Sequence, residues 1–383
     1  MRGHGAAATL SIAAALALAG CGGEAPGPAA GVERFDSAGL TVVRWSGEGH
    51  PAPLDPAAES ALLDASAVPD LRRGDVAVGP DGAVHVLDRA GRRVLVFTPG
   101  TPEPDTLGAA PPGDPDALVA PTLLAVGPDG RVAVFDRPRR GVVLFGGEGN
   151  RGLLRLPQPL QGEALAWTEL GLLGVVGGFA SSDSLDFRLQ AFRLTGPAAD
   201  LASLRVPVPQ LLDPADCPVA IPFPRPFESR LVWAARGERV AVNAGAEYRI
   251  TLLEGGEPRM VIEGARAPRA ATPRLAAAQL ADTVVLGDGA GCRVVAADVV
   301  KRVGHGPLVP AVSALALAPD GTLWVGRDGE GVDLYDRGGD YLGTLAPGTP
   351  FPAAFVSHDR YLAVVAEPGG PALVPFRLRR RAP

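Results

Sequence analysis

The sequence predicts an all-β fold, because one short motif recurs along it with the same internal pattern. Val76–Arg89 reads VAVGPDGAVHVLDR, Leu124–Arg137 reads LAVGPDGRVAVFDR, and a looser copy at Leu315–Asp328 reads LALAPDGTLWVGRD. In each copy an apolar run leads through Pro-Asp-Gly into a second alternating run. Pro, Asp and Gly are the residues that tight turns select, so each copy predicts two strands of a hairpin. Repetition at about 40–50 residues is typical of the blades of a β-propeller.

Weaker copies of the motif bring the number of predicted blades to six. A meander of three strands is too small to bury its own faces, so the blades are expected to pack around a common axis. The predicted blades span residues 74–97, 122–146, 163–196, 230–256, 312–345 and 353–378. A lone strand at Leu40–Trp45 is expected to complete the last blade and close the ring.

Residues 272–303 allow two interpretations. Thr272 followed by Pro273 predicts the start of a helix that runs through an alanine-rich stretch to Asp282, and a second helix is expected after Gly291. We therefore expect a mostly helical insertion. In the alternative, the segment is a seventh blade with strands near residues 284–286 and 293–296.

The N-terminal segment has the pattern of an export signal. Ala6–Ala19 is an apolar run too short to span a bilayer, which takes about 20 residues. It ends at Leu-Ala-Gly-Cys21, which resembles the lipobox of bacterial lipoproteins and implies lipidation of Cys21; the alternative is an ordinary signal peptide with an incidental cysteine. Residues 1–20 are thus a predicted signal peptide, 21–35 a flexible tether and 36–383 the propeller domain. Gly22 after the cysteine favours the outer membrane over the inner one.

Composition excludes some functional classes. The chain contains 50 glycines and 39 prolines, but its 46% hydrophobic content favours many short strands over disorder. The net charge is −6 and the sequence shows no basic patch of the density that nucleic acid requires, so no nucleic-acid partner is expected.

Several segments together resemble a family of bacterial six-bladed propeller lipoproteins related to NHL-type propellers. They are Asp36–Val43 (DSAGLTVV), Pro222–Pro226 (PFPRP), Glu247–Ile250 (EYRI) and Val309–Val325 (VPAVSALALAPDGTLWV), in addition to the two clearest blades. The resemblance implies the fold, export and a helical stretch between the fourth and fifth blades, and it implies no reaction. The chain departs from the family at Ala109–Leu118, where it carries AAPPGDPDAL in place of a glycine- and glutamate-rich link.

Two cysteines remain besides Cys21. Cys217 and Cys292 are an even pair in a compartment that permits disulfides, so we expect a bridge between them; the alternative is two separate buried thiols. Neither has a Cys-x-x-Cys partner or a nearby histidine, so no metal site is predicted there.

Four polar residues that end central strands are candidate ligand residues of the channel: Asp88, Asp136, Asn243 and Asp328. Catalytic propellers such as the gluconolactonases hold a divalent cation with a Glu, an Asn and Asps that project into the channel. The alternative role for each residue is a hydrogen bond that fixes a blade corner. The Asp of Pro-Asp-Gly, as in Asp81, is expected to be a turn residue.

No motif of catalytic residues is found in the sequence. We therefore predict a lipid-anchored binding or scaffold module for a protein, peptide or glycan partner, with membrane contact through the lipid. The alternative is a metal-dependent hydrolase or lactonase of the gluconolactonase type. A lyase with a catalytic histidine in the channel, His85 or His358, is a third hypothesis.

The lipobox gives a direct prediction. Cys21→Ser should abolish metabolic labelling with a fatty acid and release the protein from the membrane fraction. The lipobox implies three acyl chains on Cys21, and three chains bury far more CH₂ groups than a single chain, which binds a membrane only marginally. A variant that stays with the membranes would show that the anchor lies elsewhere.

Overall fold

The computed structural model describes residues 31–47, 49–64, 66–111, 114, 117–146, 151–213, 220–264, 267–286 and 292–380. The predicted signal peptide, most of the tether and Cys21 lie outside these residues. The first strand, β1 (Val32–Ser37), begins inside the segment predicted as tether. None of the helices in the described ranges is long and apolar enough to cross a membrane.

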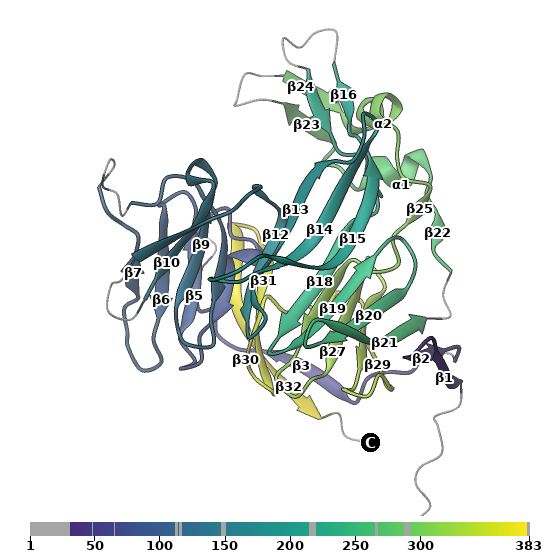
Figure 1. The fold of residues 1–383 in the computed structure, drawn as a ribbon, viewed down its shortest axis with the longest axis horizontal. Helices are drawn as coiled ribbons and strands as arrows, with labels where there is room; N and C mark the ends of the chain where they lie inside the picture. The colour runs from purple at the N-terminus through teal and green to yellow at the C-terminus, as the bar shows by residue number, and fades with distance from the viewer. Residues whose placement is uncertain are drawn as a thin grey trace, which may run out of the picture.

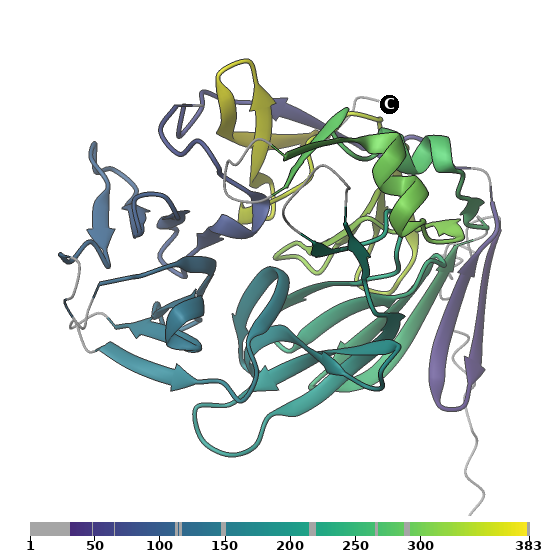
Figure 2. The ribbon, with the colours of Figure 1, turned by 90° about the horizontal axis from the view of Figure 1, so that it is seen from above.

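Six blades form a propeller ring, as predicted (Figure 1); five are four-stranded sheets, and the fourth blade supplies four strands of a six-stranded sheet. The first two blades are β4 (Val76–Val78), β5 (Val84–Asp88), β6 (Arg93–Phe97) and β7 (Asp105–Leu107), then β8 (Pro121–Val126), β9 (Val132–Asp136), β10 (Gly141–Phe145) and β11 (Arg151–Arg155). The next two are β12 (Leu160–Thr168), β13 (Gly171–Phe179), β14 (Ser184–Phe192) and β15 (Ala199–Pro207), then β18 (Leu231–Arg236), β19 (Arg239–Ala244), β20 (Arg249–Glu254) and β21 (Glu257–Gly264). The last two are β26 (Ala314–Leu317), β27 (Leu323–Arg327), β28 (Gly331–Tyr335) and β29 (Tyr341–Leu345), then β30 (Ala354–Ser357), β31 (Arg360–Glu367), β32 (Gly370–Arg380) and β3 (Leu54–Ala58). Figure 2 shows the ring from above, with successive blades arranged around its axis.

Buried apolar side chains fill each junction between neighbouring blades. In the first blade, Val84 and Val86 pack against Leu362 and Leu373 of the last blade. Leu87, on the opposite face of β5, packs against the second blade. Equivalent clusters lie at the other four junctions of the described structure. Each blade therefore buries both of its faces against its two neighbours, as the alternation of side chains along a strand requires.

The Pro-Asp-Gly segments are the turns between the first and second strands of their blades. Asp81 Oδ1 accepts a hydrogen bond from the backbone N–H of Ala83 at 3.0 Å, and Gly82 has a φ of +81°. The equivalent bonds at Asp129 and Asp320 measure 3.1 and 2.9 Å. The side chain of the aspartate and the left-handed glycine therefore explain the recurrence of the motif, as the sequence predicted.

The ring is not closed by the strand that the sequence predicts. Leu40–Trp45 is β2, which pairs in parallel with β21 and, with β1 on its other side, extends the fourth blade to six strands. Trp45 of β2 stacks on Tyr341 of the fifth blade with ring centroids 4.2 Å apart. The last blade is completed by β3, which pairs antiparallel with β32. Its sequence, LDPAA, has little apolar alternation, and this explains why it was not identified.

The insertion is a mixture of helices and strands rather than mostly helical. It contains α1 (Pro273–Ala278), the hairpin β23 (Thr283–Leu286) and β24 (Cys292–Val295), and α2 (Ala296–Val303). The predicted first helix start is confirmed, since Thr272 Oγ1 accepts a hydrogen bond from Leu275 N–H at 3.3 Å. The second helix begins at Ala296, later than predicted, because the residues before it pair as β24.

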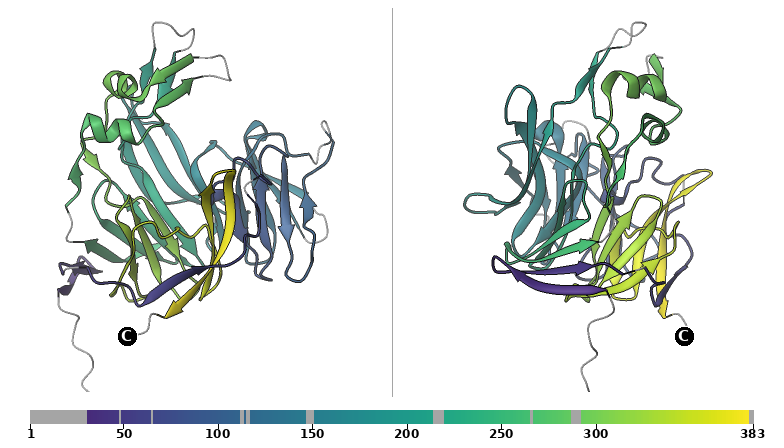
Figure 3. Two further views of the ribbon diagram at one scale, coloured as in Figure 1. Left: turned by 180° about the vertical axis from the view of Figure 1, so that it is seen from behind. Right: turned by 90° about the vertical axis from the view of Figure 1, so that its right-hand side faces the viewer.

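The β23–β24 hairpin is not a seventh blade. Its buried residue Leu286 packs with Val299 of α2 and with Leu212 of β16 (Gln210–Leu212), which pairs with β17 (Ile221–Phe223). The short strands β22 (Arg269–Ala270) and β25 (Leu308–Val309) pair with each other where the insertion joins the ring. Figure 3 shows the insertion standing at one end of the molecule, above the ring.

A buried polar network joins the fourth and fifth blades. Asp333 Oδ2 accepts a hydrogen bond from the hydroxyl of Tyr248 at 3.0 Å and lies 3.0 Å from Nε of Arg327. Tyr335 donates to the Tyr248 hydroxyl at 2.9 Å, and Thr344 donates to Asp333 Oδ1 at 2.5 Å. Burial raises the pKa of both tyrosines, so they remain donors at neutral pH.

Removal of the carboxylate at the centre of this network should destabilise the fold. We expect Asp333→Ala to lower the free energy of unfolding by about 3 kcal/mol, because it leaves a buried arginine and a buried tyrosine hydroxyl with fewer partners. Asp340→Ala, which removes an exposed ion pair with Arg34, should cost less than about 1 kcal/mol. Urea unfolding of both variants measures the difference, and equal losses would contradict the role assigned to Asp333.

Candidate functional site

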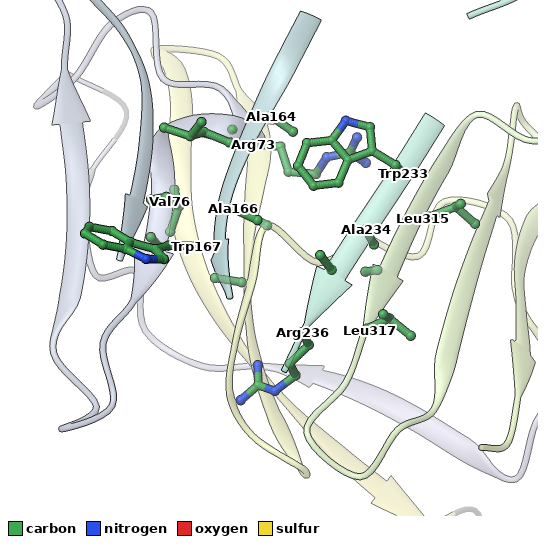
Figure 4. Close-up of a pocket in the computed structure, with 18 of the residues that line it drawn as sticks. Arg73, Val76, Ala164, Ala166, Trp167, Trp233, Ala234, Arg236, Leu315 and Leu317 are labelled. Carbon is green, nitrogen blue, oxygen red and sulfur yellow. The ribbon is translucent and has the colours of Figure 1, made fainter. Parts of the chain in front are cut away.

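A central channel of about 1590 Å³ runs along the axis of the ring. It is lined by the innermost strand of every blade, namely β4, β8, β12, β18, β26 and β30. Apolar side chains dominate these strands, mainly alanine, valine and leucine, and Figure 4 shows Ala164, Ala166 and Ala234 along the wall with Leu315 and Leu317. Because alanine leaves space that a larger side chain would fill, this composition keeps the channel wide.

Two tryptophans line the channel from neighbouring blades. Trp167 lies on β12, and the guanidinium of Arg131 lies over its ring at 4.8 Å from the ring centroid. Trp233 lies on β18 and is partly exposed. Aromatic rings of this kind offer a large, rigid contact surface to a ligand.

One end of the channel is rich in arginine. It lies where the innermost strands begin, on the side of the insertion, and we call it the arginine mouth. Its charged lining residues among those described are five arginines and one carboxylate: Arg72, Arg73, Arg89, Arg137, Arg230 and Asp75.

The other end has the opposite balance of charge. It lies where the innermost strands turn into the second strands, and we call it the turn mouth. Its charged lining residues among those described are five carboxylates and three arginines: Asp81, Glu169, Glu238, Glu254, Asp320, Arg236, Arg239 and Arg337. Figure 4 shows Arg73 and Arg236 at the two opposite ends. The channel therefore has a charge gradient along its axis.

The one carboxylate of the arginine mouth already has protein partners. Asp75 is 2% exposed, accepts a hydrogen bond from the backbone N–H of Arg72 at 2.8 Å, and pairs with Arg89 at 3.1 Å. Burial raises the pKa of Asp75 to about 6, although the charge of Arg89 opposes this shift. Arg89 also lies 3.2 Å from the carboxylate of Asp70, so both Asp75 and Arg89 have partners within the protein.

Two other arginines of this mouth keep most of their donors available. Arg137 is exposed, and within the described part of the chain its guanidinium has no hydrogen-bond or ion-pair partner. Arg230 donates one N–H to the carbonyl oxygen of Ser313 at 3.1 Å. A guanidinium with free donors can bind a carboxylate or phosphate through two parallel hydrogen bonds.

The four predicted channel residues do not line the channel and are not brought together. Asp88 accepts hydrogen bonds from Gly91 N–H at 2.7 Å and Arg93 Nε at 2.9 Å. Asp136 accepts hydrogen bonds from the backbone N–H groups of Val119 and Ala120 at 2.9 and 3.0 Å. Both carboxylates are buried and fix the corners of their blades.

The other two candidates have similar local roles. Asn243 donates to the carbonyl oxygens of Glu247 and Arg249 at 2.8 and 2.9 Å. Asp328 is exposed and accepts a hydrogen bond at 3.0 Å from Gln279, at the end of α1 in the insertion. These positions therefore do not fit a divalent cation held in the channel.

The sequence reasoning missed the residues that follow two of these aspartates. Arg89 and Arg137 come directly after Asp88 and Asp136, and both line the channel. The signal was present in the Asp-Arg pair that ends two copies of the motif. Because the aspartate turns back into its own blade corner, the arginine beside it is the residue that reaches the channel.

Other candidate residues lie away from the channel. His85, considered for a lyase, is buried within the first blade, where burial lowers its pKa. Among the described residues, no group of three or more His, Cys, Asp or Glu side chains could hold a metal ion. Cys292 is buried in the insertion and disulfide-bonded, but Cys217 lies outside the described residues, so the pairing of the two stays a prediction.

The raised pKa of Asp75 predicts a dependence of stability on pH. The folded protein retains a proton that the unfolded chain, with the ordinary pKa of 3.8, releases. The stability that depends on this proton is therefore complete below about pH 4 and decreases as the pH rises to about 6, by up to about 3 kcal/mol.

Urea unfolding between about pH 4 and pH 6 should show that the free energy of unfolding of the wild-type chain decreases relative to that of Asp75→Asn, whose side-chain amide cannot ionise. Asp105→Asn, which changes an exposed carboxylate on β7, serves as the control and should follow the wild type. Parallel curves for wild type and Asp75→Asn would contradict the assignment.

Comparison with known proteins finds likenesses in structure only. No protein-family model matches the chain, and no curated protein matches it. A gluconolactonase from Xanthomonas campestris is 15% identical, with 87% of this chain and 98% of that chain covered and a TM-score of 0.43. A protein from Bacteroides fragilis described as a predicted exported protein is 11% identical, with 89% and 100% covered and a TM-score of 0.49. A calcium-binding protein, regucalcin, from Agrobacterium tumefaciens is 15% identical, with 85% and 96% covered and a TM-score of 0.43. At these identities the likeness concerns the fold.

Proposed function

We propose that this chain is an exported, lipid-anchored binding module that takes part of a protein, peptide or glycan partner into its central channel. The observation that carries the proposal is the channel itself, which all six innermost strands line with mainly apolar side chains. The lipid on Cys21 would hold the module at the cell envelope, at the outer membrane in preference to the inner one.

The size and lining of the channel support binding of a segment larger than a typical small molecule. Sites for drug-sized ligands enclose roughly 300–1,000 Å³, and this channel is larger, at about 1590 Å³. Tryptophan and arginine, the residue types that dominate the energetics of protein interfaces, lie on the wall and at the mouths. Trp233 and Arg137 are both accessible from the channel.

A chemical step is not part of this proposal. The hydrolase alternative requires carboxylates and an asparagine that project into the channel around a cation. The side chains predicted for that role, such as Asp136 and Asn243, are instead held by hydrogen bonds at blade corners.

Filling the channel should abolish binding without loss of the fold. We expect Ala166→Trp and Ala234→Trp, on two different blades, to reduce binding to peptide and glycan arrays at least about tenfold, since an indole would occupy the space beside the wall. Each variant is tested as the full chain, and its melting temperature must equal that of the wild type.

Phe179→Ser is the matched control, because Phe179 is 77% exposed at the end of β13 and does not line the channel. It should bind the same array spots as the wild type. Array signals that survive both channel-filling substitutions would contradict the proposal.

A further inference from the structure

We propose that the ligand of the channel is an acidic peptide segment whose carboxylates bind at the arginine mouth. This inference rests on the proposed function and specifies its ligand. It is carried by the charge gradient along the channel together with the apolar wall between the two mouths.

The charge gradient determines at which mouth the acidic end of a ligand binds. The arginine mouth has five arginines and one carboxylate among its described lining residues, and the turn mouth has three arginines and five carboxylates. Attraction between charges is stronger inside a cavity with low-dielectric walls than in open water. An acidic group is therefore favoured at the arginine mouth and disfavoured at the turn mouth.

The protein neutralises only part of the arginine mouth. Asp70 and Asp75 both pair with Arg89, and neither carboxylate is paired with Arg137 or Arg230. Arg137 has no partner for its guanidinium in the described part of the chain, and Arg230 uses a single N–H. These donors are available for the oxygens of a ligand.

The arginines approach the mouth from different blades. Arg72 precedes the first blade, Arg137 follows the second strand of the second blade, and Arg230 precedes the fourth blade. Guanidinium groups spread around the ring can bind several carboxylates of an extended chain. A single small anion could contact only some of them.

The wall favours a peptide over a glycan. The innermost strands offer mainly alanine, valine and leucine, with Ala166, Ala234 and Leu317 as examples. Sugar hydroxyls that lose water against such a wall without new partners would cost free energy. Apolar peptide side chains would instead gain from burial, and Trp233 offers them an aromatic surface.

The experiment compares two acetylated ten-residue peptides by isothermal titration calorimetry with the full chain. The acidic peptide has four glutamates in one half and leucines and alanines in the other, and its partner peptide has glutamines in place of the glutamates. We expect the acidic peptide to bind at least about tenfold more tightly, with an advantage that shrinks as salt increases.

Charge reversal tests the mouth. Arg137→Glu and Arg230→Glu should each reduce affinity for the acidic peptide about tenfold and leave affinity for the glutamine peptide within about twofold. Arg236→Glu is the matched control, because Arg236 lines the turn mouth. It should change affinity for the acidic peptide less than either of the other two variants.

Each other outcome overturns a defined part of the inference. Equal binding of both peptides, lost in Ala234→Trp, would retain the channel as the binding site and overturn the acidic preference. Binding of a galacturonate oligosaccharide instead of the peptides, with the same dependence on Arg137 and Arg230, would overturn the assignment to a peptide. If neither peptide binds but Ala234→Trp still reduces binding to the arrays, the assignment of an acidic peptide as the ligand is overturned. The proposed function is then retained.

Discussion

The structure depends on one constraint, which is that a blade of this size cannot bury either of its faces alone. Each blade packs one face against the preceding blade and the other against the following blade, so the hydrophobic core is a ring of six junctions in the described structure. This explains why strands such as β5 and β9 are buried along their whole length. It also explains why Leu362 and Leu373 of the last blade pack against Val84 and Val86 of the first, since an open ring would leave two apolar faces in water.

The same constraint leaves the innermost strands with a separate role. Their inner edges face the axis, and alanine, valine and leucine are the commonest side chains that line it there. A wide channel costs packing contacts, and these are recovered at the junctions, where Trp324, Tyr335 and Tyr361 are fully buried. The buried hydrogen bond between Tyr248 and Asp333 also links the fourth blade to the fifth. The axis is thus the part of the fold that packing determines least, and its side chains are available for a ligand.

Much of the fold could be predicted because its turns have local causes. Pro-Asp-Gly specifies a hairpin through the side chain of Asp81 and the positive φ of Gly82, and both act within a few residues. The pairing of β2 with β21 could not be predicted, because it depends on partners more than 200 residues apart, as Val42 and Val261 are. The same limit applies to the candidate site, because the direction of a side chain also depends on its partners in the fold. The position of Asp88 at a strand end was evident from the sequence, but the direction of its carboxylate depends on the N–H of Gly91 and on Arg93.

The Asp-Arg pair links the architecture of the blade to the charge of the channel. In the second blade, Asp136 is fully buried and accepts two backbone hydrogen bonds, which hold the end of β9 in place. Arg137 follows it at the start of the short 3₁₀ helix Arg137–Arg139, so its backbone is held at the blade corner. In the first blade, Arg89 follows Asp88 and is directed toward Asp75. Because the backbone of Arg137 is already ordered, binding through this residue costs less conformational entropy than binding through a residue on a flexible loop. The repeated corner motif therefore both stabilises the blade and positions the cation that gives the arginine mouth its charge.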